Sequence, residues 1–134
     1  MARIRDVFCY GTLQDPDVLS RVLRHSVPNS RLVSGTITGY QRVYVQNRTY
    51  PTLIKGEGTV SGLVFKNCTN AEWENLCAFE GAEYGVETLS AETADGELDV
   101  QVFMPGKTQK ASEREWSLET WKRSHKRSFM GNWR

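Results

Sequence analysis

Five glycines interrupt a β-rich stretch between residues 31 and 65, and they indicate how a sheet built from it must bend. The β-forming runs between them cover residues 36–38, 40–45, 51–54 and 59–65. Glycine within a strand usually marks a bulge, a sharp bend or the close approach of another backbone. So many glycines in one stretch predict a strongly curled sheet.

The N-terminal segment predicts a strand followed by a helix. Residues 6–10 are rich in β-formers and end at Gly11. Asp15 fits a helix N-cap and Pro16 fits the first helical position. The helix is expected to run to about His25.

The C-terminal half predicts a hairpin and a last helix. Residues 86–92 and 98–103 flank Asp95-Gly96, a dipeptide typical of two-residue hairpin turns. A helix over about residues 113–129 follows. With the preceding elements, this order predicts one mixed α+β domain over residues 1–134, built on a curled or barrel-like sheet.

The last helix is expected to begin at Ser112 or at Ser117 and to pack on the domain. Apolar residues and a histidine recur at helical spacing on one side of it, which is the expected packing face: Leu118, Trp121, His125 and Phe129. The basic residues fall on the other, solvated side: Lys122, Arg123, Lys126 and Arg127.

A short helix before Gly81 directs a carboxylate toward the core. Thr69 and Glu72 have the spacing of a capping box, so the helix is expected to start near Asn70. Gly81 can adopt positive φ, so the helix should end at about Glu80. At 100° per residue, Glu80 falls on the apolar stripe of Trp73, Leu76 and Cys77, whereas Glu72, Glu74 and Asn75 face solvent.

Burial predicts an altered pKa for Glu80. Loss of hydration and the negative end of the helix dipole both disfavour the charged carboxylate. The pKa is therefore expected to rise from about 4.3 toward about 6–7, where a carboxyl group can accept and return a proton at neutral pH. In the alternative interpretation, Glu80 extends into solvent at a frayed helix end or pairs with an arginine.

Composition narrows the function classes. The formal net charge is +1 and no apolar run is long enough to span a membrane, so neither nucleic acid nor membrane is expected as a partner. A basic tail at residues 122–134 is the one feature that favours nucleic acid, but such charge runs are usually solvated faces. Three widely spaced cysteines suit free thiols, and with two histidines they make a structural zinc site improbable. A cytoplasmic location is expected.

The loop after the first strand offers backbone N–H groups to an anion. Residues 11–14 join a strand to a helix start, where amides can converge on a ligand. Because no lysine accompanies them, nucleotide phosphate is a poor candidate, whereas a small carboxylate fits. A plain structural turn is the alternative.

Several motifs together resemble the gamma-glutamylcyclotransferase-like superfamily, and its AIG2-like branch most closely. They are FCYGTL at residues 8–13, Tyr50-Pro51 before a strand, Gly62 in a central strand, and LCAFEGAEY at residues 76–84. The tail TWKRSHKRSF fits the AIG2-like branch. The resemblance covers nearly the whole chain, with the motifs in the same order.

This resemblance implies a small mixed-strand β-barrel flanked by helices, and an enzyme without a cofactor. The implied reaction cyclises a gamma-glutamyl amine or amino acid to 5-oxoproline and releases the amine. Glu80 would be the general acid/base, and the substrate would bind at Tyr10, Gly11, Thr12, Leu13, Tyr50 and Tyr84. A monomer or weak dimer is expected.

The chain departs from the family pattern at two places. Many members carry Asp where this chain has Cys77, and many carry Arg where it has Gly85 and Val86. Cys77 either fills the core or reflects an altered mode of ligand anchoring. A non-catalytic small-ligand binding or scaffold protein that retains the pocket is therefore the alternative function.

Overall fold

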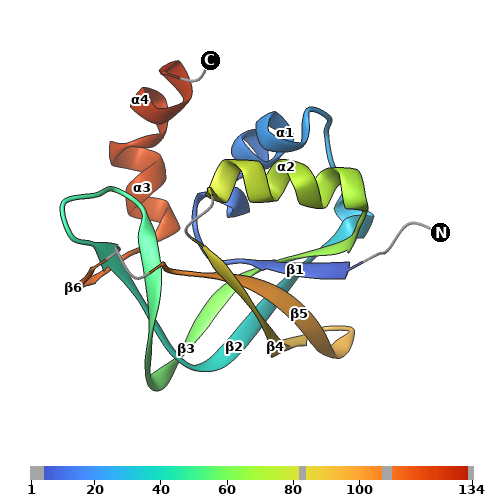
Figure 1. The fold of residues 1–134 in the computed structure, drawn as a ribbon, viewed down its shortest axis with the longest axis horizontal. Helices are drawn as coiled ribbons and strands as arrows, with labels where there is room; N and C mark the ends of the chain where they lie inside the picture. Colours follow the sequence, from blue (N-terminus) through green and yellow to red (C-terminus); the bar gives the residue numbers. More distant parts are fainter. Residues whose placement is uncertain (1–4, 82–83, 107–109, 133–134) are drawn as a thin grey trace.

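The strands close into a barrel in the computed structural model, which describes residues 5–81, 84–106 and 110–132 (Figure 1). The strand order is β3-β1-β5-β4-β2, and β2 pairs again with β3. The β1–β5 pairing is parallel and the others are antiparallel. The strands are β1 (Arg5–Cys9), β2 (Leu32–Val45), β3 (Pro51–Cys68), β4 (Gly85–Thr93), β5 (Gly96–Met104) and β6 (Ala111–Glu115), which extends the sheet from β2. The expected α+β barrel is confirmed.

Helices cover one end of this barrel. In Figure 1, α1 and α2 lie together above the strands, and α3 and α4 stand beside them. Among the described residues, no helix is both long and apolar enough to cross a membrane. The helices are α1 (Pro16–Leu23), α2 (Asn70–Glu80), α3 (Leu118–Ser124) and α4 (Lys126–Gly131), with 3-10 turns η1 (Thr12–Gln14) and η2 (Asn29–Arg31).

β2 and β3 run through all five glycines of the stretch between residues 31 and 65. β2 is 14 residues long and β3 is 18, so four expected short strands are two long ones. At Gly39 the φ angle is +91°, and the pairing register shifts between Thr38 and Tyr40. The ladder therefore bends at the glycines without breaking, because hydrogen bonding continues on both sides of the bulge.

Gly62 allows β1 to lie directly on β3. A Cβ atom at this position would be 2.5 Å from the carbonyl oxygen of Cys9 and 2.6 Å from Cζ of Phe8. A backbone carbonyl in a paired strand cannot move away without breaking its ladder. The closeness of β1 to the barrel wall thus depends on the missing side chain.

The segment expected to open the last helix is a strand. β6 pairs with β2, and the buried ring of Trp116 donates from Nε1 to the carbonyl oxygen of Thr49 over 2.9 Å. The Ser112 hydroxyl accepts the local N–H of Arg114 within β6, whereas Ser117 caps α3 by accepting from Thr120. Of the two expected starts, Ser117 is confirmed and the helix over residues 113–117 was wrong.

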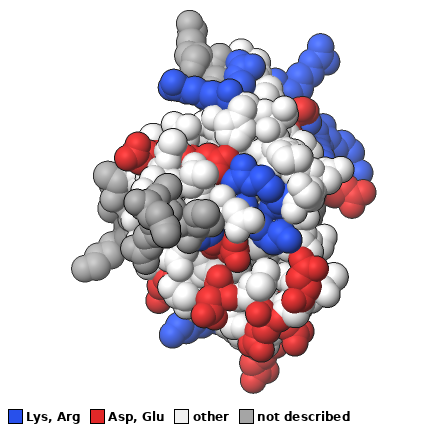
Figure 2. All heavy atoms as spheres, turned by 90° about the vertical axis from the view of Figure 1, so that its right-hand side faces the viewer, with Lys and Arg blue, Asp and Glu red and all other residues white. Residues whose placement is uncertain are grey.

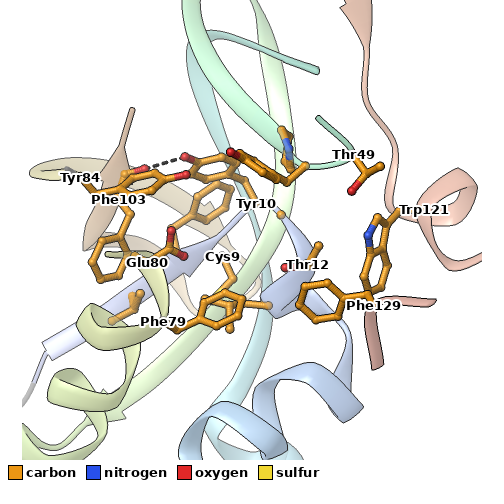
Figure 3. Close-up of a pocket in the computed structure, with 16 residues that line it drawn as sticks. Cys9, Tyr10, Thr12, Thr49, Phe79, Glu80, Tyr84, Phe103, Trp121 and Phe129 are labelled. Carbon is orange, nitrogen blue, oxygen red and sulfur yellow. Dashed lines mark hydrogen bonds between the residues drawn. The ribbon is translucent and has the colours of Figure 1, made fainter. Parts of the chain in front are cut away.

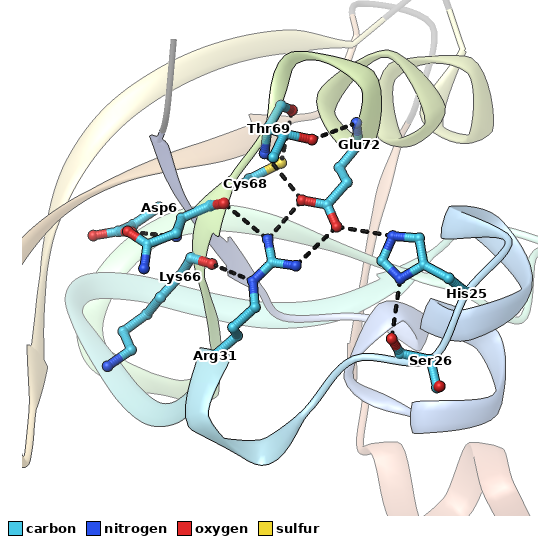
Figure 4. Close-up of polar contacts among 9 residues, drawn as sticks. Asp6, His25, Ser26, Arg31, Lys66, Cys68, Thr69 and Glu72 are labelled. Atoms are coloured by element: carbon cyan, nitrogen blue, oxygen red, sulfur yellow. Dashed lines mark hydrogen bonds and ion pairs between the residues drawn. The ribbon is translucent and has the colours of Figure 1, made fainter. Parts of the chain in front are cut away.

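A second correction concerns Glu72, which the helical pattern placed in solvent. The C-terminal end of α2 borders the cavity shown in Figure 3, and its N-terminal end is fixed by the contacts in Figure 4. The carboxylate of Glu72 is buried and accepts from Arg31 over 2.6 and 3.0 Å, and its Oε2 lies 2.9 Å from Nε2 of His25. Burial alone would raise the pKa of Glu72, but Arg31, the Thr69 N–H and His25 hold it at about 2.

Lys126 is also not a simple solvated side chain. Its Nζ lies 3.0 Å from Oδ2 of Asp15 and 2.7 Å from Oδ2 of Asp17. Asp15 is completely buried and caps α1, as its sequence pattern predicts. These ion pairs connect α4 to the start of α1.

Charged side chains separate on the face shown in Figure 2. Asp and Glu gather on its lower part, and most Lys and Arg lie above them. On this face, a chain of formal net charge +1 therefore presents a mainly acidic lower part and a more basic upper part. The hairpin of β4 and β5 exposes five acidic residues: Glu87, Glu92, Asp95, Glu97 and Asp99.

We expect Gly62→Ala to lower the free energy of unfolding by roughly 1–3 kcal/mol, because the new methyl group must displace β1. Gly85→Ala is the matched control, since a Cβ there meets nothing within 4 Å. Urea denaturation of both variants measures the difference. Equal stability of the two variants would show that β1 does not need the space at Gly62.

We expect Glu72→Gln to lower the free energy of unfolding by about 1–3 kcal/mol at neutral pH, because Arg31 loses its charged partner. Since the pKa of Glu72 is lowered, its contribution is present above its usual value and is lost as the pH falls from 4.5 toward 2. The difference in free energy of unfolding between Glu72→Gln and the wild type should therefore narrow as the pH falls from 4.5 toward 2. The exposed Glu74→Gln on the same helix should show no such pH dependence.

Candidate active site

A cavity of about 300 Å³ lies between the end of α2, the loop after β1 and the C-terminal helices (Figure 3). All seven residues proposed from the sequence line it: Tyr10, Gly11, Thr12, Leu13, Tyr50, Glu80 and Tyr84. They come from four separate parts of the chain. The remaining lining residues are Val7, Phe8, Cys9, Thr49, Pro51, Phe79, Phe103, Trp121 and Phe129.

Glu80 is the last residue of α2 and extends into this cavity. Its side chain is half-buried, and burial raises the pKa of the carboxyl group to about 7. No ion pair of Glu80 occurs with any described residue, so the arginine pairing considered from the sequence is absent there. Gly81 follows with φ +94° and donates its N–H to Cys77, which ends the helix at the expected place.

Tyr10 forms one wall of the cavity rather than a free donor. Its hydroxyl donates to the carbonyl oxygen of Phe103 over 2.6 Å. Burial, followed by the nearby charge of Glu80, raises its pKa well above the usual value. Phe103 stacks on Trp73 at 5.1 Å and meets Tyr84 edge-on at 6.5 Å, so the wall is rigid on both sides.

The loop after β1 presents backbone N–H groups beside the cavity. Gln14 and Asp15 donate their N–H groups to the carbonyl oxygens of Gly11 and Thr12, which forms the single turn η1. Within the described hydrogen bonds, those turn contacts leave the N–H groups of Gly11, Thr12 and Leu13 without a backbone acceptor. A Cβ at Gly11 would lie 3.2 Å from Cγ of Pro51, so a larger residue would push the loop and that ring apart by a few tenths of an ångström.

Arg42 fixes this loop from behind, a role that the sequence analysis missed. It donates from Nη1 to the carbonyl oxygens of Tyr10 and Ser61 over 3.0 and 2.8 Å, and from Nε to that of Trp116 over 3.3 Å. Burial lowers the pKa of its guanidinium. Its partners come from distant segments, so no local sequence signal could have revealed the contacts.

An aromatic cluster was also missed as part of the site. The ring centroids of Phe79 and Phe129 lie 6.4 Å apart, and those of Phe129 and Trp121 lie 5.5 Å apart. The helical spacing predicted correctly that Trp121 and Phe129 face the body of the protein. It could not show that this face borders a cavity.

Two cysteines lie near Glu80 without a chemical role of their own. Cys9 lines the cavity, and burial, followed by the charge of Glu80, raises its pKa far above the usual thiol value. It therefore stays protonated and is a poor nucleophile. Cys77 packs against the core and does not line the cavity, which favours the core-filling interpretation of this departure.

Known proteins share both the sequence pattern and the fold. The family described as gamma-glutamyl cyclotransferase, AIG2-like matches residues 7–123. AIG2-like protein A of Arabidopsis thaliana is 36% identical over 132 residues, which cover 96% of this chain and 78% of that protein. AIG2-like protein C of the same plant is 35% identical over 130 residues, covering 93% of this chain and 73% of that protein.

Solved structures agree. The solution structure of one Arabidopsis thaliana protein has a TM-score of 0.72 at 25% identity, covering 96% of this chain and 79% of that one. The solution structure of a second protein from the same plant has a TM-score of 0.69 at 36% identity, covering 96% of this chain and 87% of that one. A structure named gamma-glutamyl cyclotransferase has a TM-score of 0.62 at 15% identity over 81% of this chain and 70% of that one, a likeness of fold. The chain belongs to the AIG2-like gamma-glutamyl cyclotransferase family.

Proposed function

We propose that this protein converts a gamma-glutamyl amine or amino acid to 5-oxoproline and the free amine. The observation that carries the proposal is the meeting, in one cavity, of the Glu80 carboxyl group and the backbone N–H groups of residues 11–13. Family membership supports cyclotransferase chemistry. The pKa of Glu80, raised to about 7 by burial, suits proton exchange near neutral pH.

The substrate supplies both reacting groups. Its α-amine, in the neutral form, attacks its own γ-carbonyl carbon and forms a five-membered ring. Such a reaction within one molecule can gain an effective concentration of about 10⁵ M or more. The protein must therefore hold the bent conformation, which the amides of Gly11, Thr12 and Leu13 do by binding the α-carboxylate.

Glu80 then moves one proton. As the new C–N bond forms, the attacking nitrogen becomes positively charged and gives a proton to the Glu80 carboxylate. The protonated Glu80 returns this proton to the departing nitrogen as the old C–N bond breaks, so carboxylate and enzyme are regenerated. A single carboxyl group near both nitrogens can perform both transfers.

The developing oxyanion needs a donor. Tyr10 is unsuited, because its hydroxyl already donates to Phe103. Tyr50 and Tyr84 also line the cavity, and we propose that one of them donates to the oxygen in the transition state.

Glu80→Gln should lower kcat for 5-oxoproline release by about 10²–10⁴-fold, because the amide keeps the size of the side chain but cannot exchange a proton. The assay uses purified protein with a panel of gamma-glutamyl amines and amino acids. Glu74→Gln, exposed on the same helix, should retain full activity. A folded Glu80→Gln variant with wild-type rates would remove Glu80 from the mechanism, and an inactive wild type would favour the binding-protein alternative.

The pH profile of kcat/KM should show an acid limb with an apparent pKa near 7, the value of Glu80. The rate rises through this limb because the general base must be deprotonated in the free enzyme. Substrate analogues altered at the glutamyl α-carbon, whose α-amines differ in pKa, separate the two ionisations, since the limb of Glu80 should stay in place. A limb at 4.5, the usual value for Glu, would contradict the raised pKa.

A further inference from the structure

One wall of the cavity is aromatic and is supplied mainly by segments that do not take part in the proposed proton transfer. Figure 3 shows Phe79, Phe129 and Trp121 in succession along it, with Glu80 and Tyr84 toward the other end. Trp121 is completely buried, whereas Phe79 and Phe129 are half-buried. The rings of Phe79 and Phe129 therefore present apolar surface to a ligand, and Trp121 packs edge-on against Phe129.

The same cavity offers little to a second anion. Among the described residues that line it, Glu80 is the one with a charged side chain, and it is acidic. The amides of the loop after β1 are occupied by the α-carboxylate of the glutamyl group in the proposed complex. A carboxylate on the leaving group would then lose hydration without gaining a cationic partner among the described lining residues.

We propose that the leaving group is an apolar or aromatic primary amine without a carboxylate, and that Phe129 determines this specificity. The inference rests on the proposed cyclisation, because it assigns the remainder of the cavity to the group that departs. Phe129 and Trp121 contact each other across the break between α3 and α4, so the wall depends on how α4 is held.

The position of α4 is fixed by ion pairs as well as by the packing of Phe129 and Met130 on the core. Lys126 lies in its first turn and pairs with Asp15 and Asp17 at the start of α1. Phe129 follows Lys126 by three residues on the same helix, so these ion pairs help to hold its ring at the cavity.

Three substrates test the proposal: gamma-glutamyl-phenethylamine, gamma-glutamyl-phenylalanine and gamma-glutamyl-ethylamine. The first two differ only in the carboxylate of the leaving group, and the first and third differ only in the ring. We expect kcat/KM for the phenethylamine compound to exceed that for the phenylalanine compound by at least about tenfold, because the buried carboxylate is unpaired. The kcat/KM for the phenethylamine compound should also exceed the kcat/KM for the ethylamine compound by roughly tenfold or more.

Variants at Phe129 identify the residue responsible. Phe129→Ala should remove most of the preference for phenethylamine over ethylamine. Phe129→Lys should raise kcat/KM for the phenylalanine compound relative to the phenethylamine compound, because it places a cation near the carboxylate. Met130→Ala is the control, since Met130 lies on the same helix but does not line this cavity; an equal loss of preference in it would overturn the assignment to Phe129.

Binding to the Glu80→Gln variant, measured by calorimetry, separates this inference from the cyclisation itself. If the wild type cyclises the phenylalanine compound as efficiently as the phenethylamine compound, the leaving-group proposal fails and the cyclotransferase proposal stands. If the wild type cyclises none of the three, the reaction proposal fails. In that case, tighter binding of the phenethylamine compound than of the other two compounds to Glu80→Gln would still support the apolar wall. Equal binding of the three compounds, or no binding, would overturn it.

Discussion

The close contact between β1 and β3 at Gly62 is the constraint on which the site depends. β1 joins two strands of the barrel, one antiparallel and one parallel, and the loop after it carries residues 11–13, which line the cavity. Any side chain at Gly62 would meet the carbonyl oxygen of Cys9, immediately before Tyr10. The same backbone position therefore determines both the closure of the barrel and the placement of the candidate anion-binding loop.

α2 shows how one helix can hold two carboxylates in opposite electrostatic states. At its first turn, Glu72 is buried together with Arg31, and its pKa falls to about 2. At its last residue, Glu80 is half-buried without a described cation, and the loss of hydration raises its pKa to about 7. The charged pair anchors the helix to the body of the protein, so the second carboxylate can be held away from water without being displaced. The first turn of α2 thus contributes to stability, and its last residue carries the proposed proton-transfer group.

Local signals explain what the sequence could and could not reveal. The limits of α2 follow from Thr69, Glu72 and Gly81, and the hairpin follows from Asp95-Gly96, because each signal lies within a few residues of its effect. The burial of Glu72 could not be seen, since Arg31 lies 41 positions away. β6 was missed for a similar reason: its short polar sequence becomes a strand only because β2 offers an edge to pair with. The aromatic wall of the cavity could not be predicted from the sequence, because it depends on how α3 and α4 pack on the rest of the protein.

The break at His125 separates two kinds of residue in the chain. Before it lie the barrel, the loop and the carboxyl group; after it lies α4, a single short helix attached by Lys126 and bearing Phe129. A change at the end of α4 alters the shape and polarity of the cavity without disturbing a barrel hydrogen bond. In evolutionary terms, such a chain can acquire a new preference through a few substitutions in α4 that leave the proposed proton-transfer group unchanged. The arrangement makes selectivity more evolvable than chemistry.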